Sequence, residues 1–323
     1  DAKLQSVQVK AAAIDIDKTT VQEIHAEALD GDANIRQTTV EVALLQASGM
    51  ARVVDVAATR MLELSGHDTV ALSSSAPSAY LTSDGGASRV FGQTGQMLVA
   101  TAARVWIGDS QVASILANAE VAATVHRVEA DAITAEARES VSIYDAKARV
   151  VSGTADKVDV ASVTAAQQTY EGSRTVTLQG QNTGMVEVAT QHLSAHGKFD
   201  GALKVKTGSA IITQATTGQL DVDASGAVIL AGSTTGKRAK IRAASSLGIL
   251  RNPSTEEIDL SFDYIVGGEH LLLVDEEVAK LVVAQTSTTP LWLRNLVATA
   301  ASTTIISAGD IDGRKSRMDA TGD

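Results

Sequence analysis

Short stretches in which small apolar residues alternate with polar ones dominate the chain. Apolar side chains take every second position, and charged or hydroxyl side chains take the positions between them. Alternation with a period of two is typical of strands with one buried face. The clearest stretches are residues 128–132, 133–138, 145–150, 157–160, 175–178, 186–188, 203–205 and 220–224.

These stretches recur through residues 1–250, and neighbouring centres are roughly 8 to 10 residues apart, as expected when a tight turn follows each strand. The centres lie near Ile14, Val42, Val53, Leu64, Leu72, Val99, Ile107, Val121, Ile133, Val141, Val150, Val158, Val176, Val186, Leu203, Ile212, Leu220, Ile229 and Ile241. Stacked β-coils need only an inward apolar set from each coil, so they keep a regular spacing without strict sequence repetition. The sequence therefore predicts an all-β protein, an elongated β-helix or β-solenoid.

Turn residues agree with this prediction. Glycine falls at many predicted strand boundaries: Gly153, Gly172, Gly180, Gly184, Gly197, Gly201, Gly208, Gly218, Gly226, Gly232 and Gly236. The only prolines are Pro77, Pro253 and Pro290. Every amide between residues 78 and 252 is therefore available for strand pairing.

A long helix or coiled coil is the alternative for residues 113–149, where Ala and Glu are common. A helical seam can be drawn through Val121, Val125, Val128, Ala132 and Ala135. It fails at the next two seam positions, which are Glu139 and Ser142. We favour strands here and keep some helix in this stretch as an open alternative.

The pattern changes around Pro253. Residues 258–264 still alternate, whereas residues 274–285 predict a short helix or a compact strand pair, and the polar stretch 309–323 predicts a loose end. We predict a β-helical shaft over residues 1–250 and a small C-terminal cap or attachment domain over residues 251–323. A cap would cover the unpaired strand edges of the last coil.

Composition narrows the possible partners. Aromatic residues make up only 3% of a chain that is 44% hydrophobic, so the interior is a thin layer of Val, Ile, Leu and Ala. The formal charge of −11 argues against nucleic acid and against docking on anionic lipid, and leaves other membrane contact open. The absence of cysteine excludes disulfides and thiolate metal sites.

Two motifs resemble ligand loops but lack essential residues. Residues 232–237 resemble a phosphate-binding loop, yet Ala231 stands at the first glycine position and Arg238 replaces the hydroxyl residue. Asp30, Asp32, Asn34 and Glu41 have the spacing of a calcium loop, but Ile35 stands where that loop needs glycine. We interpret both as surface turns.

Histidines and aromatic residues give no stronger candidates. His192 and His196 are four residues apart and His67 precedes Asp68, in each case without a third nearby ligand. Aromatic residues are spread along the chain and are interpreted as isolated packing residues: Tyr80, Phe91, Trp106, Tyr144, Tyr170, Phe199, Phe262, Tyr264 and Trp292. The sequence therefore predicts no catalytic, cofactor-binding or metal-binding residues, no cofactor and no enzymatic activity.

Residues 114–250 resemble a known class of β-helical spike. The most suggestive segment is Gln168-Thr-Tyr170-Glu-Gly172 followed by Val176-Thr-Leu178-Gln-Gly180. It is similar to paired strands in the needle segments of phage central-spike proteins and their type VI secretion relatives. The resemblance implies three chains wound around one axis, with Val, Ile, Ala and Thr filling a shared core.

Three functions are consistent with this fold. The first is a homotrimeric spike, shaft or stalk of a phage-like particle or cell-surface assembly, whose partners are other structural subunits. The second is an extracellular adhesion or membrane-complex ectodomain resembling the β-helical stalks of sarcoglycans, which a leader or membrane anchor upstream of Asp1 would favour. The third is a single-chain β-helix enzyme acting on polysaccharide. All three place the protein outside the cell, on its surface or in a virion, and the sequence leaves open whether the β-helix is a single chain or an intertwined trimer.

Overall fold

The computed structural model describes the backbone of residues 4–231, 234–250, 257–265, 280–285, 291–292, 297–300, 302–307, 311–312 and 317–320. Side-chain positions are described for residues 5–230 and 240–243. The chain divides into two compact units, Asp1–Asp156 and Lys157–Asp323. The described residues form strands and no helix, and the strands build parallel β-solenoids, so the predicted fold class is confirmed.

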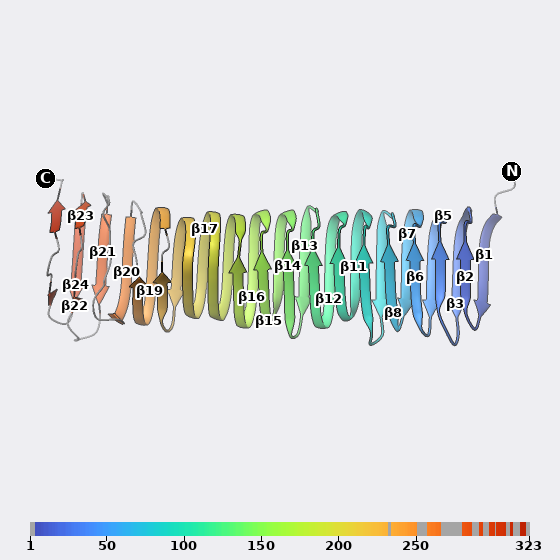
Figure 1. Cartoon of the computed structure of the whole chain (residues 1–323), viewed down its shortest axis with the longest axis horizontal. Helices are drawn as coiled ribbons and strands as arrows, with labels where there is room; N and C mark the ends of the chain where they lie inside the picture. The colour runs from blue at the N-terminus through green and yellow to red at the C-terminus, as the bar shows by residue number, and fades with distance from the viewer. Residues whose placement is uncertain are drawn as a thin grey trace. The chain divides into compact units, whose positions relative to one another are not determined.

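In the first unit each coil has a longer strand on one side, here called the first side, and a shorter strand on the second side (Figure 1). The first-side strands are β1 (Leu4–Ala11), β3 (Val21–Ala28), β5 (Thr39–Ala47), β7 (Ala57–Gly66), β9 (Ser78–Ser83) and β13 (Ala132–Ala137). The second-side strands are β2 (Ile14–Asp17), β4 (Ala33–Arg36), β6 (Met50–Val54), β8 (Asp68–Leu72), β10 (Ala87–Phe91) and β14 (Ser140–Tyr144). Strands β11 (Thr94–Gly108) and β12 (Gln111–His126) run through both sides, and β15 (Lys147–Ala161) begins as the last first-side strand.

Each strand pairs in parallel with the strand one coil further along the same chain. Leu4 pairs with Val21 and Ile14 pairs with Ala33, which are offsets of 17 and 19 residues. Isolated bridges such as Ala57 with Ser75 close a short third side. A single chain therefore completes each coil by itself.

Inward side chains stack into columns because paired residues lie directly above one another. One column on the first side runs through Ile24, Ala43, Leu62, Ala79, Leu98, Ile115, Ile133 and Val151. One on the second side runs through Ile16, Ile35, Val53, Ala71, Val90, Ile107, Val125 and Ile143. Nearly all of these side chains are buried, and their small volumes suit a narrow interior.

A left-handed residue marks the corner after each second-side strand of the first unit. Glycine takes this position only at Gly92; elsewhere it is held by Lys18, Gln37, Asp55, Ser73, Asp109, Arg127 and Asp145, with φ between 46° and 54°. The next residue turns inward and is buried, as Ser74 and Ser110 are. The hydroxyl of Ser110 donates to the carbonyl of Gly108 (2.7 Å) and accepts the amide of Gln93 in the preceding coil (3.1 Å).

Carboxylates organise the corner between the first and second sides. Asp32 Oδ1 accepts the amide of Met50 (2.8 Å), and Asp68 Oδ1 accepts the amide of Ala87 (2.7 Å), so each carboxylate ties one coil to the next. A Cβ atom on Gly49 would lie 2.4 Å from Asp32 Oδ1. A side chain at this position would displace the Asp32 carboxylate from its bond with the Met50 amide.

The second unit contains β16 (Thr164–Gln179) and the long strand β17 (Gln181–Ala224), which passes through more than two coils and pairs with itself in successive passes. It continues with β18 (Val228–Ala231), β19 (Thr234–Leu250), β20 (Glu257–Ile265), β21 (Lys280–Gln285) and β24 (Ser302–Ser307). These strands also pair in parallel. Two further parallel pairs join β22 (Leu291–Trp292) to β25 (Ile311–Asp312) and β23 (Val297–Ala300) to β26 (Arg317–Ala320).

Several local predictions are wrong. Residues 128–131 form a corner in which Glu129 makes isolated bridges to Gln111 and Lys147, because the chain must turn after β12, and Ala132 already begins β13. In residues 113–149, by contrast, the favoured strand interpretation is confirmed by β12, β13, β14 and the start of β15, and the helical alternative is excluded. Gly153, Gly172 and Gly208 lie inside strands, and most left-handed corners of the first unit use residues other than glycine.

The C-terminal predictions are tested only in part. Residues 280–285 form a strand and not a helix, whereas residues 274–279 lie outside the described residues. Strand β20 pairs in parallel with β19, across the boundary predicted at residue 250. The separate cap domain and the trimer stay predictions.

Candidate functional sites

Residues predicted to resemble ligand loops have structural roles in the first unit. Asp32 binds a backbone amide of the next coil, Asn34 lies in β4, and Ile35 is fully buried in the core. In the described part of the chain no group of three or more His, Asp or Glu side chains is placed to hold a metal ion. Of the phosphate-loop residues, Gly232 and Ser233 lie outside the described residues and the rest begin β19.

The histidines singled out in the sequence contact neighbouring coils. His192 and His196 are exposed on β17, where their Nδ1 atoms lie 2.7 Å from Ser209 Oγ and 3.4 Å from Thr213 Oγ1. His67 Nδ1 lies 3.5 Å from Asp84 Oδ1. Each contact spans one coil on the solenoid surface.

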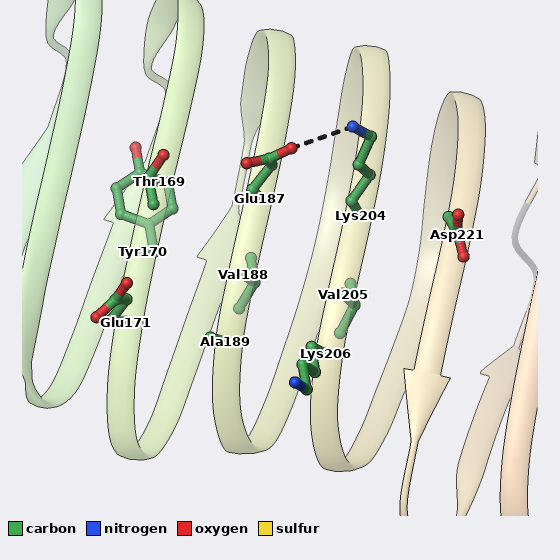
Figure 2. Close-up of a pocket in the computed structure, with 10 residues that line it drawn as sticks. All are labelled: Thr169, Tyr170, Glu171, Glu187, Val188, Ala189, Lys204, Val205, Lys206 and Asp221. Atoms are coloured by element: carbon green, nitrogen blue, oxygen red, sulfur yellow. Dashed lines mark hydrogen bonds and ion pairs between the residues drawn. The ribbon is translucent and has the colours of Figure 1, made fainter.

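A shallow depression of about 360 Å³ lies over β16 and β17 in the second unit (Figure 2). Thr169, Glu187, Lys204 and Asp221 follow one another on its outer face in successive passes of the chain. Lys204 Nζ lies 3.1 Å from Glu187 Oε1, and the register places Lys240 after Asp221. We call Glu187, Lys204, Asp221 and Lys240 the charge ladder.

The charge ladder lets parallel strands carry charged residues at neighbouring positions without repulsion. In a parallel register identical positions lie about 4.8 Å apart, so neighbours of one sign would repel and alternating signs attract. Val188 and Val205 point into the core beside the ladder (Figure 2). The depression is open to solvent, the charges of the ladder alternate in sign, and Glu187 and Lys204 form an ion pair.

Buried polar groups beneath this surface form one network. The Tyr170 hydroxyl donates to Gln168 Oε1 (2.9 Å), and Gln168 Nε2 donates to the carbonyls of Thr183 (2.7 Å) and Val163 (3.2 Å). Burial raises the pKa of Tyr170 far above its ordinary value. The tyrosine is therefore a neutral core donor rather than an acid or base.

Among the described residues of the second unit, Asp200 also has a shifted pKa. Hydrogen bonds from Lys198 Nζ (2.6 Å) and Gln181 Nε2 (3.0 Å) hold the pKa of this exposed carboxyl below its ordinary value. Both partners stabilise the charged form. This pattern is that of a solvated surface ion pair.

Phe91, Trp106 and Tyr144 lie on the second side of the first unit. Leu72 pairs with Phe91, Phe91 with Gly108, Gly108 with His126, and His126 with Tyr144. The guanidinium of Arg89 lies 5.3 Å from the centre of the Trp106 ring, within the range of a cation–π contact. Phe91 and Tyr144 share one column although they are far apart in the sequence, because each coil returns the chain to the same side.

The first side of the same unit carries a surface with almost no charge, here called the neutral face. It comprises the outward residues of seven successive coils: Val42, Leu44, Gln46, Met61, Glu63, Ser65, Ser78, Tyr80, Thr82, Met97, Val99, Thr101, Ser114, Leu116, Asn118, Ala132, Thr134, Glu136, Val150, Ser152 and Thr154. None of them is buried, and Leu116 is 38% exposed. Glu63 and Glu136 are the only charged members.

The comparisons with known proteins give no relatives. No family model, no curated protein and no solved structure matches this chain. In the described part of the chain no helix is long and apolar enough to cross a membrane.

Proposed function

We propose that this protein is a structural, non-catalytic element, a stiff β-solenoid spacer in a spike, shaft or stalk of a phage-like particle or cell-surface assembly. The observation that carries the proposal is the continuous stacking of the inward columns in the first unit. Each column is extended by every coil, and each coil is bonded through its backbone to the next. A fold of this kind suits a mechanical role better than it suits catalysis in a cleft.

The energetics support stiffness. Burying one Val, Ile or Leu side chain contributes about 1.5–3 kcal/mol, and each coil buries several of them. Corner hydroxyls and carboxylates add bonds between neighbouring coils, as Ser110 and Asp32 do. Opening one coil therefore disrupts backbone pairing, core packing and corner contacts together.

The cellular setting and stoichiometry belong to the proposal as well. A location outside the cell or in a virion, a homotrimer and contacts with other structural subunits are predictions from the sequence. The ectodomain and polysaccharide-acting alternatives predict, respectively, attachment to a membrane complex and cleavage of a glycan. The open, ion-paired depression over the charge ladder gives the enzyme alternative no support.

Single-molecule force spectroscopy of the full chain tests the mechanical role. Coils of 17–19 residues should each release roughly 55–70 Å of contour length at about 3.3–3.6 Å per residue. We expect unfolding in steps of this size or its multiples, at forces well above those for random-coil stretching. Smooth extension at low force, or cleavage of a polysaccharide by the purified protein, would overturn the proposal.

A further inference from the structure

The neutral face differs from the equivalent surface of the second unit. Both consist of outward positions five, seven and nine residues after a left-handed corner, such as Val150, Ser152 and Thr154 after Asp145. In β7 the positions come one residue later, because the register shifts there. After Ser162 the same positions hold Gln167, Thr169 and Glu171, and the middle position begins the column that leads into the charge ladder. The fold thus accepts charges at these positions, and their near absence from the neutral face needs another explanation.

The neutral face shares its low charge and its Met and Tyr residues with protein interfaces, and its other polar members are mainly Ser and Thr. Interface cores are depleted of charge and enriched in Met and Tyr, and this face holds Met61, Met97 and Tyr80 with Leu44 and Leu116. Because the chain carries a formal charge of −11, two copies repel each other over most of their surfaces. The neutral face is a place where copies can meet without that repulsion.

The size of the face is sufficient for a stable contact. Seven coils at about 4.8 Å and five residues at about 3.3 Å give a rectangle of about 550 Å². Two such faces would bury about 1,100 Å², above the roughly 1,000 Å² expected of a specific interface.

We propose that the neutral face binds the neutral face of a second copy of this chain, with the two solenoids antiparallel. The two-fold axis lies along the strand direction and passes through the coil of Val99, so that coils on one side of Val99 face coils on the other side of it in the partner. This inference names the partner of the proposed structural element and rests on that proposed function. It is an alternative to the predicted trimer.

Complementarity selects the antiparallel arrangement. Counting coils outward from Val99 places Tyr80 opposite Leu116 and the long side chain of Met61 opposite the short one of Ala132. Glu63 then faces Thr134, whose hydroxyl can donate to the carboxylate. A parallel pair would instead place each Glu63 against its own copy, and the two like charges would repel.

The hydroxyl and amide residues at the edge of the face fit the same arrangement. Ser65 comes opposite Glu136, so the second carboxylate also meets a hydroxyl group. Thr101 lies opposite its own copy and Gln46 opposite Thr154. Each charged member of the face thus has a neutral hydrogen-bonding partner, and polar groups line one edge of the contact.

Native mass measurement with paired variants tests the contact. We expect about twice 33.4 kDa for the wild-type chain at micromolar concentration. Leu116→Lys should dissociate it to about 33.4 kDa, since it places a charge opposite Tyr80 in a desolvated contact. Ile211→Lys is the matched control, because Ile211 is a 49% exposed apolar strand residue in the other unit, and this variant should stay a dimer.

Cross-linking tests the orientation, and the absence of cysteine from the chain makes it unambiguous. In the antiparallel pair Val42 faces Val150 of the second copy, whereas the two copies of either residue are about 29 Å apart along the solenoid. A short bis-maleimide should therefore link the double variant Val42→Cys/Val150→Cys into a covalent dimer and leave each single variant unlinked. Linking of Val42→Cys alone would overturn the antiparallel arrangement.

The remaining outcomes are equally decisive. A monomeric wild-type chain, a trimer, or equal behaviour of Leu116→Lys and Ile211→Lys would overturn the contact. Unfolding under force is measured on single chains, so a monomer that resists force would sink this inference and leave the structural role intact. A dimer that extends smoothly at low force would overturn the structural role and leave the contact between neutral faces intact.

Discussion

At the scale of single residues, buried hydroxyl groups at the corners provide hydrogen-bond partners for the backbone. At the left-handed corner of Asp109 the amide of Gln93 in the preceding coil bonds to a side chain and not to a carbonyl. Ser110 Oγ accepts this amide and also donates to the Gly108 carbonyl, which accepts the Gly92 amide as well (3.2 Å). A hydroxyl side chain is therefore needed at this buried position to bond the backbone.

Removing this hydroxyl should destabilise the protein. Ser110→Ala leaves the buried amide of Gln93 without its acceptor, whereas the Gly108 carbonyl keeps its bond from the Gly92 amide, and we expect a loss of about 1–3 kcal/mol in the free energy of unfolding. Urea denaturation followed by circular dichroism measures it. Ser194→Ala, at an exposed position of β17 outside the neutral face, is the control and should change stability by less than about 0.5 kcal/mol. Equal effects of the two variants would contradict the assigned role of Ser110.

Tyr170 gives a second residue-scale prediction, on pH dependence. Its pKa is raised in the folded state, so its contribution to stability is complete below the unfolded pKa of about 10 and is lost as the pH rises above that value. Unfolding at alkaline pH is favoured because only the unfolded chain ionises this tyrosine readily.

The variant Tyr170→Phe isolates the effect. It removes the ionisable group and also the donor to Gln168 Oε1, so it should be less stable than the wild type at neutral pH. Its stability should then fall less steeply than that of the wild type between neutral and strongly alkaline pH. Urea titrations at several pH values compare the two slopes, and identical slopes would refute the buried, neutral state of Tyr170.

At the scale of elements, the charge ladder shows how stacked strands accommodate charge. Changing Lys204→Glu would place Glu187, the new carboxylate and Asp221 in succession on one face. We expect a loss of stability below about 1 kcal/mol at low ionic strength, because these groups are solvent-exposed. The loss should shrink as salt is added, since exposed charges are screened over about 10 Å at 0.1 M salt.

Lys204→Gln separates repulsion from the loss of the ion pair. It removes the contact with Glu187 without adding a negative charge, so it should cost less than Lys204→Glu and depend less on salt. Thermal melting in low and high salt measures both variants. A salt-independent loss for Lys204→Glu would show that packing, not charge, controls this position.

The sequence predicts elements of this fold better than it predicts their connections. Alternation identifies β13, because Ile133 and Ala135 point inward between polar neighbours. The same pattern misplaces a strand at 128–132, where Val128 is buried for a different reason, as the inward residue of a corner. The corners are hard to read because residues as different as Lys18, Asp55 and Ser73 share one left-handed conformation.

Surfaces depend on register, which alternation alone does not define. Phe91 and Tyr144 are far apart in the sequence, and only the offsets of each coil place them in one column. The neutral face is likewise assembled from seven separate segments. If the left-handed corners were known, the column of Phe91 and Tyr144 and most of the neutral face could be found by comparing residues at the same distance from each corner.

At the scale of the whole molecule, a solenoid is a nearly one-dimensional array in which each coil contacts only its neighbours. Removing one complete coil should therefore leave a foldable protein. Deletion of residues 56–73 removes β7 and β8 and joins Asp55 to Ser74, which replaces one left-handed corner residue, Ser73, by another. β5 would then pair with β9, and β6 with β10.

The inward columns remain continuous after this deletion. Leu45 would stack on Leu81 and Val53 on Val90, both apolar pairs, while the hydrogen bond between Thr69 and Ser88 (2.7 Å) is lost. We expect a cooperative thermal transition and a strand-type circular dichroism spectrum, with a lower melting temperature than the wild type.

Deleting residues 56–64 instead removes half a coil and provides the contrast. First-side residues would then meet second-side residues across the cut, so corners would stack on strands and inward columns on outward ones. This variant should lose its cooperative transition. If both deletions melted alike, the stability of the first unit would not depend on coil register, and the account of the fold as stacked, register-locked coils would fail.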